Sequence, residues 1–383
     1  MGTDTGWSRA AGESSGRWRT ILERAAGRAR VPGSEPEQPV QPATPPPGTY
    51  PTSGQPSAPY AAAGGYPAAA PVGATGTAPY GPGQPATYSS AYSVPAQRSG
   101  ASAVLGIVPT PGSAAERAIA ILRRKLDKPR VIAFANPKGG VHKTTATVLT
   151  AAAIGGARGR GVLAWDDNEL RGTLGLRAGS ARHARTIRHL VAELAEVELN
   201  TGPALAARLD DFLRHASDGT YDVLAGEEDP RFAWRLDAPT VRRILDLLTQ
   251  THEVICVDTG NNVESSNWRT IMESADQLVI TTVPREDSAF SADWMMDVLI
   301  EAGRAELVAN AVTIVSMTTP RPGPLQDDLV RHFRQRNRAV CVVPYDPYLE
   351  RGGWIDHNAL APATREAWLQ AAAVIMEPFG VSG

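Results

Sequence analysis

The residues with the clearest chemical potential form one run of ten, NPKGGVHKTT at residues 136–145. The run lies between a short apolar stretch typical of a β-strand, residues 130–136, and a helix-like segment, residues 144–157. In that context a glycine-containing loop binds phosphates, because its backbone N–H groups and the N-terminus of the following helix point at the anion. Lys143 would then reach the outer phosphates, and the Thr144 hydroxyl would face a magnesium ion. The run therefore predicts a nucleotide site.

A carboxylate with a matching role stands in the run VICVDTG of residues 254–260. Four apolar residues predict a buried strand, and Asp258 follows them directly. A carboxylate at that place can hold the water shell of a magnesium ion beside a phosphate loop. An aspartate after a strand can also cap a helix, but its position downstream of a phosphate loop favours the metal role. We therefore expect Thr144 and Asp258 to be the metal-side residues.

The elements that must position these residues follow one alternating pattern. Apolar runs typical of strands occupy residues 130–136, 161–165, 221–226, 253–258, 277–283, 311–317 and 339–344. Segments with helical character occupy residues 114–126, 144–157, 184–197, 203–215, 239–250, 265–274, 290–303, 325–336 and 362–377. Continuous apolar strands separated by helices predict an α/β fold, a doubly wound, mostly parallel sheet of the P-loop NTPase kind. Its functional loops are expected at the carboxyl ends of the strands.

The N-terminal third has a different composition. Of the 31 prolines, 16 lie between Pro32 and residue 100, together with six of the nine tyrosines. Such a stretch cannot bury enough apolar surface to offset its ordering entropy. We therefore predict a disordered linker over residues 32–112 and a folded domain over residues 113–383. Residues 1–31 carry six arginines against three acids and predict either an amphipathic helix for a partner or a fraying terminus.

Charge, cysteine content and hydropathy narrow the class of protein. The formal net charge of −2 excludes a protein that works through overall basicity. Cys256 and Cys341 lie in apolar runs without a CxxC partner, so we expect reduced core thiols in a cytoplasmic protein. No window approaches the roughly 18 uninterrupted apolar residues that a transmembrane helix needs. The sequence therefore predicts no transmembrane segment.

The run KGGVHKTT resembles the KGGVGKTT signature of the ParA/MinD family of deviant P-loop ATPases. The resemblance covers residues 130 to about 378 and implies an ATPase that uses ATP and Mg²⁺. It also implies a nucleotide-sandwich homodimer, in which Lys138 reaches the phosphates bound by the partner subunit. The implied nucleotide contacts are Lys138, Gly139, Gly140, Val141, His142, Lys143, Thr144 and Thr145.

This sequence departs from the family pattern at two places. His142 stands where the family has the last glycine of the loop, which costs on the order of 1 kcal/mol if the backbone is left-handed. After the second strand, Asp166 matches the first carboxylate of the family, while Asn168 stands at the second, the water-positioning one. Alternatively, Asp167 takes that role through a shift of one residue. We therefore expect catalysis to involve Lys138, Lys143, Asp167 and Asn168, with slow hydrolysis.

The resemblance also suggests contacts near the last strands. Ser316 and Pro344 are expected near the adenine base. Arg331, Arg334, Arg336 and Arg338 could contact DNA phosphates without reading sequence, or they could be solvated cations at a helix C-terminus.

The leading hypothesis for function is an ATP-dependent dimerising switch that positions or partitions a cargo, either a DNA segment or a cytoplasmic assembly. The alternative is a non-hydrolysing, nucleotide-binding scaffold. The Pro/Ala/Gly-rich front also resembles ATPases associated with type VII secretion in actinobacteria, a likeness of architecture only. An unidentified protein partner is expected to bind the N-terminal region.

Overall fold

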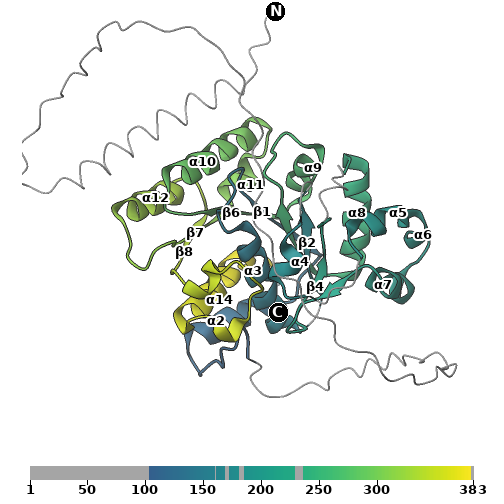
Figure 1. Cartoon of the computed structure of the whole chain (residues 1–383), viewed down its shortest axis with the longest axis horizontal. Coiled ribbons are helices and arrows are strands. Elements are labelled where there is room, and N and C mark those ends of the chain that lie inside the picture. The colour runs from purple at the N-terminus through teal and green to yellow at the C-terminus, as the bar shows by residue number, and fades with distance from the viewer. Residues whose placement is uncertain (1–102, 160, 169–171, 181–184, 229–235, 381–383) are drawn as a thin grey trace, which may run out of the picture. The chain divides into compact units, whose positions relative to one another are not determined.

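The computed structural model describes residues 103–159, 161–168, 172–180, 185–228 and 236–380. Within these residues the chain forms one eight-stranded sheet with the strand order β3-β4-β2-β5-β1-β6-β7-β8 (Figure 1). The strands are β1 (Arg130–Ala135), β2 (Val162–Asp167), β3 (Arg214–His215), β4 (Asp222–Leu224), β5 (Val254–Thr259), β6 (Gln277–Thr282), β7 (Val312–Ser316) and β8 (Ala339–Val343).

The helices connect the strands and cover the sheet. They are α2 (Ala114–Leu122), α3 (Lys143–Arg158), α4 (Leu174–Arg177), α5 (Ile187–Ala192), α6 (Leu194–Val197), α7 (Gly202–Asp210), α8 (Ala238–Thr251), α9 (Ser266–Ser274), α10 (Glu286–Glu301), α11 (Ala305–Ala309), α12 (Pro324–Arg334), α13 (Pro347–Glu350), the 3₁₀ turn η2 (His357–Ala359) and α14 (Pro362–Met376). None of the helices in the described part of the chain is long and apolar enough to cross a bilayer.

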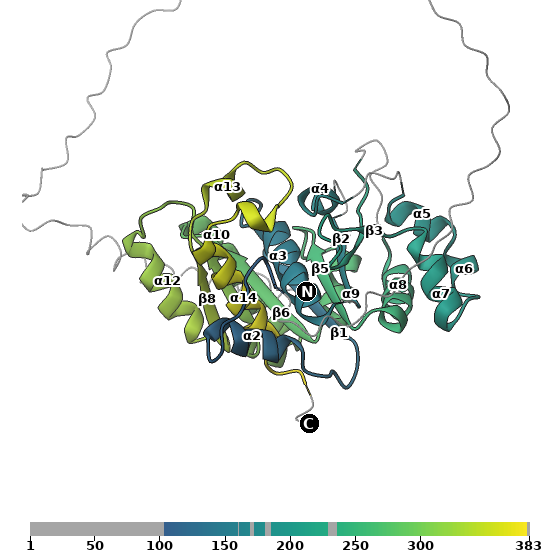
Figure 2. The same ribbon diagram turned by 90° about the horizontal axis from the view of Figure 1, so that it is seen from below.

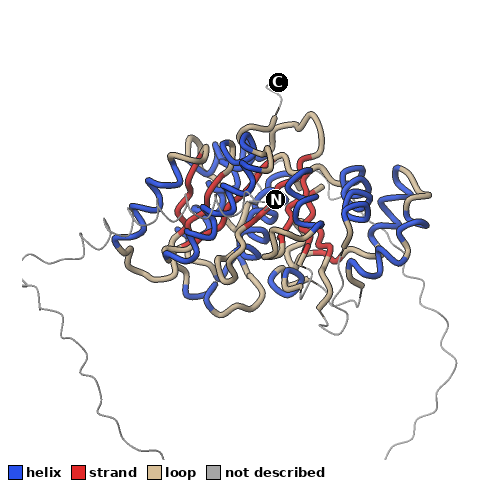
Figure 3. The backbone as a smooth tube through the Cα atoms, turned by 90° about the horizontal axis from the view of Figure 1, so that it is seen from above, coloured by secondary structure: helices blue, strands red, loops and turns tan. Residues whose placement is uncertain are grey.

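The sheet is parallel except at one edge, and helices cover both of its faces. The core on one face is formed with α2, α3 and α14, and the core on the other with α8, α9, α10 and α12 (Figure 2). Figure 3 shows the strands between these layers of helices. The strands β2, β5, β6 and β7 are buried along their whole length, which explains why they read as continuous apolar runs. The predicted doubly wound, mostly parallel α/β fold is confirmed.

The structure departs from the predicted elements near the sheet edge beside β4. The segment predicted as one helix over residues 203–215 ends as α7 at Asp210, and Arg214 and His215 instead pair antiparallel with β4. A tight turn at Asp218 and Gly219, where Gly219 has φ 65°, allows this hairpin. The Asp-Gly pair is a hairpin signal that helical periodicity alone overlooks.

The packed part of the chain begins before residue 113. Val104 and Leu105 are 0% and 4% exposed, and both belong to the core that contains α2, α3 and α14. Val104 lies so close to Gly156 of α3 that a Cβ at Gly156 would come within 3.5 Å of its Cγ1. The apolar residues that precede α2 therefore contribute to the fold, which corrects the predicted boundary at Ser113. The predicted helix within residues 1–31 and residues 32–102 of the predicted linker lie outside the described residues.

Candidate functional site

The predicted phosphate loop joins the end of β1 to the start of α3. Gly140 has φ 74°, and His142 has φ 63° and ψ 28° directly before the first residue of α3. The left-handed backbone expected at the position of the family glycine is therefore present, and a histidine occupies it. A residue with a Cβ pays about 1–2 kcal/mol for this conformation relative to a right-handed one.

Asn136 fixes the start of the loop. Its side chain is buried, and Nδ2 donates to the carbonyl oxygens of Thr281 at 2.8 Å and Ser288 at 3.1 Å. Its Oδ1 accepts from the backbone N–H of Lys138 at 2.9 Å. One amide thus ties the loop to β6 and to α10, so the backbone of the loop is held before any ligand arrives.

Lys143 spans the loop from the first turn of α3. Its Nζ donates to the carbonyl oxygens of Asn136 at 2.9 Å and Lys138 at 3.2 Å, and to Oδ1 of Asn261 at 2.5 Å. Burial lowers the pKa of Lys143, and the charge of Asp258 opposes that shift. Asn261 follows β5, so this ammonium group connects the phosphate loop to the segment after the predicted metal-side carboxylate.

The predicted metal-side residues, Thr144 and Asp258, are in direct contact. Thr144 Oγ1 donates to Asp258 Oδ2 at 2.6 Å, and the register of β2 and β5 sets Asp166 opposite Asp258. Burial raises the pKa of Asp258 to about 7, and the charge of Asp166 adds to the effect. Burial likewise raises the pKa of Asp166 to about 6.

This arrangement fits a divalent cation. Oδ1 of Asp258 is buried and has no hydrogen-bond partner among the described residues, so it can accept from a metal-bound water. Two neighbouring buried carboxylates also require a compensating positive charge when both are ionised. The hydroxyl of Thr144 adds a neutral oxygen ligand of the kind that Mg²⁺ takes.

Asp167 is the last residue of β2 and Asn168 follows it, and their surroundings favour different roles. Asp167 lies on the far face of the sheet from Asp166, where its Oδ2 accepts from Asn267 Nδ2 of α9 at 3.1 Å. Asn168 is half-buried just beyond the strand, and its backbone N–H donates to Asp166 Oδ1 at 3.2 Å. The structure therefore does not bring the side chain of Asp167 to Lys143 and Thr144, which counts against the register shift considered from the sequence.

Ser316 and Pro344 share a cavity with the phosphate loop. The cavity has a volume of about 170 Å³, and His142, Ser316 and Pro344 all line it, together with Met317, Thr318, Val343, Tyr345, Asp346, Leu349, Glu350 and Trp368. The predicted base contacts thus lie beside the N-terminal end of α3. The wall contributed by His142 is one that the family glycine could not supply.

Lys138 points to α10. Its Nζ lies 3.1 Å from Oδ2 of Asp287, and both side chains are more than 40% exposed. Asp287 also accepts from Arg285 at 2.7 Å, and this hydrogen bond, with a smaller contribution from Lys138, lowers the pKa of Asp287 to about 2. The signature lysine is thus held at the protein surface by an ionised carboxylate.

Arg177 is a residue at this site that the sequence reasoning missed. Its Nη2 donates to Thr145 Oγ1 at 2.8 Å, and its Nη1 donates to the carbonyl oxygen of Gly353 at 2.6 Å. Arg177 ends α4, a helix of four residues with no periodicity to reveal it. No motif spacing linked it to the loop.

The four arginines predicted as a basic patch are not presented together. Arg336 turns inward and pairs with the buried carboxylates of Asp293 and Asp297. Arg338 donates to the carbonyl oxygen of Val374 at 2.8 Å, and Arg331 pairs with Asp328 at 2.7 Å. Only Arg334, among these four, is exposed with no ion pair to a described residue. The structure therefore uses much of this charge to join α12 to α10 and α14.

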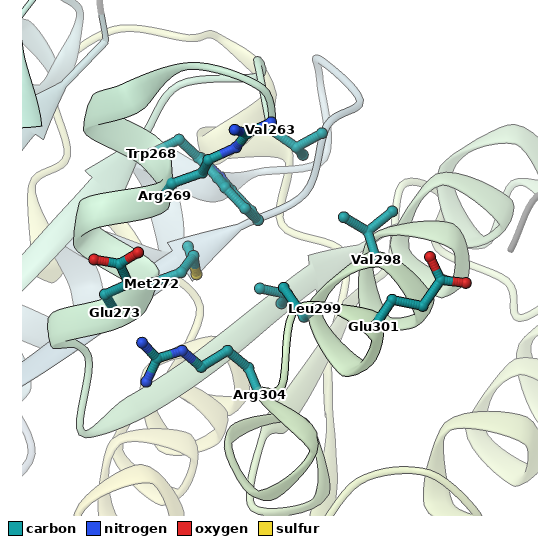
Figure 4. A pocket seen from close by; sticks show the side chains of 10 residues that line it. Val263, Trp268, Arg269, Met272, Glu273, Val298, Leu299, Glu301 and Arg304 are labelled. Atoms are coloured by element: carbon teal, nitrogen blue, oxygen red, sulfur yellow. The ribbon is translucent and has the colours of Figure 1, made fainter. Parts of the chain in front are cut away.

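A larger cavity of about 480 Å³ lies between α9 and the C-terminal part of α10 (Figure 4). The side chains of Trp268, Met272 and Leu299 form its apolar wall, with Arg304 and Glu273 at its edge. The three apolar side chains are only 2–3% exposed, so this cavity presents little apolar surface. None of the predicted site residues lines it.

Comparisons with known proteins agree with the fold. No protein-family model matches the sequence, and no curated protein matches it. Among solved structures, the chain is similar to the cell division ATPase MinD of Pyrococcus furiosus, with a TM-score of 0.50 and 22% identity over 64% of this chain and 98% of that one. It is also similar to a ParA family ATPase from Chlorobium tepidum, with a TM-score of 0.50 and 16% identity over 64% of this chain and 90% of that one. At these identities the likeness establishes a MinD/ParA-like fold.

Proposed function

We propose that this chain is a nucleotide-binding switch ATPase that binds Mg²⁺ and ATP and dimerises when ATP is bound. The observation that carries the proposal is the convergence of Lys143, Thr144 and Asp258 at the carboxyl ends of β1 and β5. These residues supply a cation for outer phosphates and oxygen ligands for a metal, in the loop context that binds phosphates.

Each loop residue has a distinct task in this proposal. Backbone N–H groups of residues 139–145 cradle the phosphates, and Lys143 exchanges its carbonyl partners for phosphate oxygens. Mg²⁺, when bound, neutralises charge that develops on the transferred phosphoryl group. Asp258 would hold the water shell of the metal through Oδ1, and Ser316 and Pro344 would contact the base.

Hydrolysis is proposed to be slow. The role of orienting the attacking water falls to Asn168, whose neutral amide polarises water less than a carboxylate does. Asp167 does not replace it, because its carboxylate lies under α9 against Asn267. The ATP-bound state should therefore be long-lived.

Lys138 is proposed to act across a homodimer interface. Its side chain is 44% exposed and is held by one surface carboxylate, Asp287, so moving it costs little. An ion pair of this kind releases the ammonium group readily to a stronger anion such as a triphosphate.

The proposed cargo is either a DNA segment or a cytoplasmic assembly, including one of the type VII secretion kind. The N-terminal region is proposed to bind the partner protein, in the cytoplasm. Of the four arginines considered for DNA, Arg334 and Arg331 would make the contact, since Arg336 and Arg338 are bonded to α10 and α14.

Light scattering with a slowly hydrolysed ATP analogue tests the switch. We expect the full chain to be a monomer without nucleotide and a dimer with it, and Lys138→Ala to bind the analogue but stay monomeric. Lys128→Ala is the matched control, because Lys128 is 60% exposed and pairs with Asp276 beyond the opposite end of β1. A wild-type chain that stays monomeric at saturation contradicts the switch. A Lys138→Ala dimer contradicts the assigned role of Lys138.

A non-hydrolysing scaffold is the second candidate, favoured by the amide at Asn168 and the inward turn of Asp167. Single-turnover measurements separate the two. Nucleotide binding without any measurable turnover, in the presence of Mg²⁺ and at saturation, would select the scaffold.

A further inference from the structure

The base cavity and the place of the outer phosphates together define the direction in which a nucleotide would lie across this site. The base cavity is lined by His142, and the outer phosphates belong beside Lys143 and Thr144. A mononucleotide that joins these ends must pass the first turn of α3, with its α-phosphate between them. Thr145 stands in that first turn, and its hydroxyl is held by Arg177 at 2.8 Å.

Arg177, the last residue of α4, lies beside that first turn, because its guanidinium group donates to the Thr145 hydroxyl. It pairs with no carboxylate among the described residues, and the bonds to Thr145 and Gly353 use only two of its five N–H donors. A half-buried guanidinium group that is held in place and not neutralised is suited to bind a phosphate oxygen.

We propose that Arg177 binds the α-phosphate of the nucleotide and thereby couples nucleotide binding to α4 and to residues 351–356. The proposal rests on the proposed function and adds a ligand outside the loop motif. Because ADP and ATP share the α-phosphate, Arg177 strengthens the binding of both equally. Lys138, by contrast, is assigned to a step that requires ATP.

The coupling has a defined route. The carbonyl oxygen of Arg177 accepts from the backbone N–H of Ile355 at 2.9 Å, and Nη1 holds Gly353. At the other end of α4, the backbone N–H of Leu174 donates to Asp166 Oδ2 at 2.9 Å. A phosphate bound by Arg177 is thus connected to the end of β2 on one side and to the segment before η2 on the other.

Calorimetric titration of the full chain with Mg·ADP and Mg·ATP tests the ligand role. We expect Arg177→Met to weaken both affinities by the same factor, about tenfold or more, since a charge-assisted hydrogen bond is lost. Arg177→Lys should recover part of the loss, and ADP binding to Arg177→Met should depend less on salt. The matched control is Arg242→Met, since Arg242 of α8 is 54% exposed, pairs with Glu273 of α9 and does not line the base cavity.

Three results would overturn the proposal: ADP affinity within twofold of wild type in Arg177→Met, a loss confined to ATP, or no recovery in Arg177→Lys. Hydrogen exchange on the wild-type chain provides a second measurement, whose result does not depend on whether a variant folds correctly. ADP should slow exchange in residues 172–180 and 351–356, and unchanged exchange in both would also contradict the proposal. A wild-type chain that binds no nucleotide defeats the proposed function itself, which separates the two failures.

Discussion

Thr144 and Asp258 are 114 positions apart in the chain, yet Oγ1 of the first donates to Oδ2 of the second over 2.6 Å. The contact joins the first turn of α3 to the end of β5, a helix and a strand that pack against each other. Asp166 lies opposite Asp258 in the neighbouring strand. The pair therefore brings a hydroxyl and two buried carboxylates to one place, which favours a cation and disfavours two bare negative charges.

Asp258→Asn should stabilise the nucleotide-free protein at pH 8. Its folded pKa of about 7 lies above the usual value of 3.8, so the folded state holds its proton more tightly than the unfolded state. The contribution of Asp258 to the free energy of unfolding is therefore greatest at low pH and is lost as the pH rises toward 8. The amide carries no charge, so at pH 8 we expect a melting temperature at least about 2–4 °C higher, the change that about 1 kcal/mol produces in a domain of this size. At low pH, near the usual carboxyl pKa, the melting temperature should be unchanged.

Thermal melts at both values of pH, in a chelator and without nucleotide, measure this effect. With Mg²⁺ and ATP present the order should reverse, because only the wild type keeps the carboxylate for the metal. A variant that melts lower than the wild type at pH 8 without ligand would contradict the account.

Asn168→Asp should raise the single-turnover rate of ATP hydrolysis at least several-fold and leave ATP affinity nearly unchanged. The added carboxylate acts on the water in the transition state and not on the bound substrate. Asp167→Asn is the matched comparison: it should leave the rate unchanged and lower stability, since it disturbs the buried contact with Asn267. If Asp167→Asn slows hydrolysis and Asn168→Asp has no effect, the shifted register is correct after all.

His142→Gly should relieve the left-handed backbone at φ 63° and act on affinity more than on rate. Glycine removes about 1 kcal/mol of strain, but it also removes the wall that His142 contributes to the base cavity. Because the loop is left-handed before any ligand binds, the relief of strain acts on stability, so we expect nearly unchanged affinity for inorganic triphosphate, which does not use that cavity, and weaker binding of ATP. Competition binding with both ligands measures the two affinities. Equal changes in affinity for the two ligands would contradict the role of His142 as a wall of the base cavity.

Removal of residues 1–102 should leave the melting temperature of the domain unchanged, whereas removal of residues 1–112 should lower it. The longer truncation deletes Val104 and Leu105, which are 0% and 4% exposed. Burial of each such side chain contributes about 1.5–3 kcal/mol. Calorimetry of the full chain and of both truncated chains measures the three melting temperatures. Equal melting temperatures for the two truncated chains would show that Val104 and Leu105 do not stabilise the fold.

Local patterns were sufficient to predict the frame of the site. The apolar runs of β1 and β5 are buried on both faces and carry an unambiguous signal, and the loop and Asp258 sit directly at their ends. Parallel strands then bring those ends together, so the contact of Thr144 with Asp258 follows from topology.

Features of the site that depend on contacts between residues far apart in the chain could not be predicted from the sequence. Arg177 contacts Thr145 from a helix of only four residues. Arg336 turns inward to pair with Asp293 and Asp297 of α10, which are 39 or more positions away in the sequence. The orientation of Asp167 depends on where β2 ends and on which helix covers that face. No periodicity encodes these choices.

Calorimetric titration of Mg·ATP into the full chain, the Lys143→Ala variant and the Lys128→Ala control tests the central claim most directly. Lys143 donates to three oxygens across the loop, so its loss should weaken ATP binding by about 100-fold or more, while far-UV dichroism stays the same. The control should bind as the wild type does. Saturable binding to the wild type that disappears in Lys143→Ala is the predicted result. Equal ATP affinity in all three chains, or no binding to the wild type, would contradict the assignment of this loop as a nucleotide site.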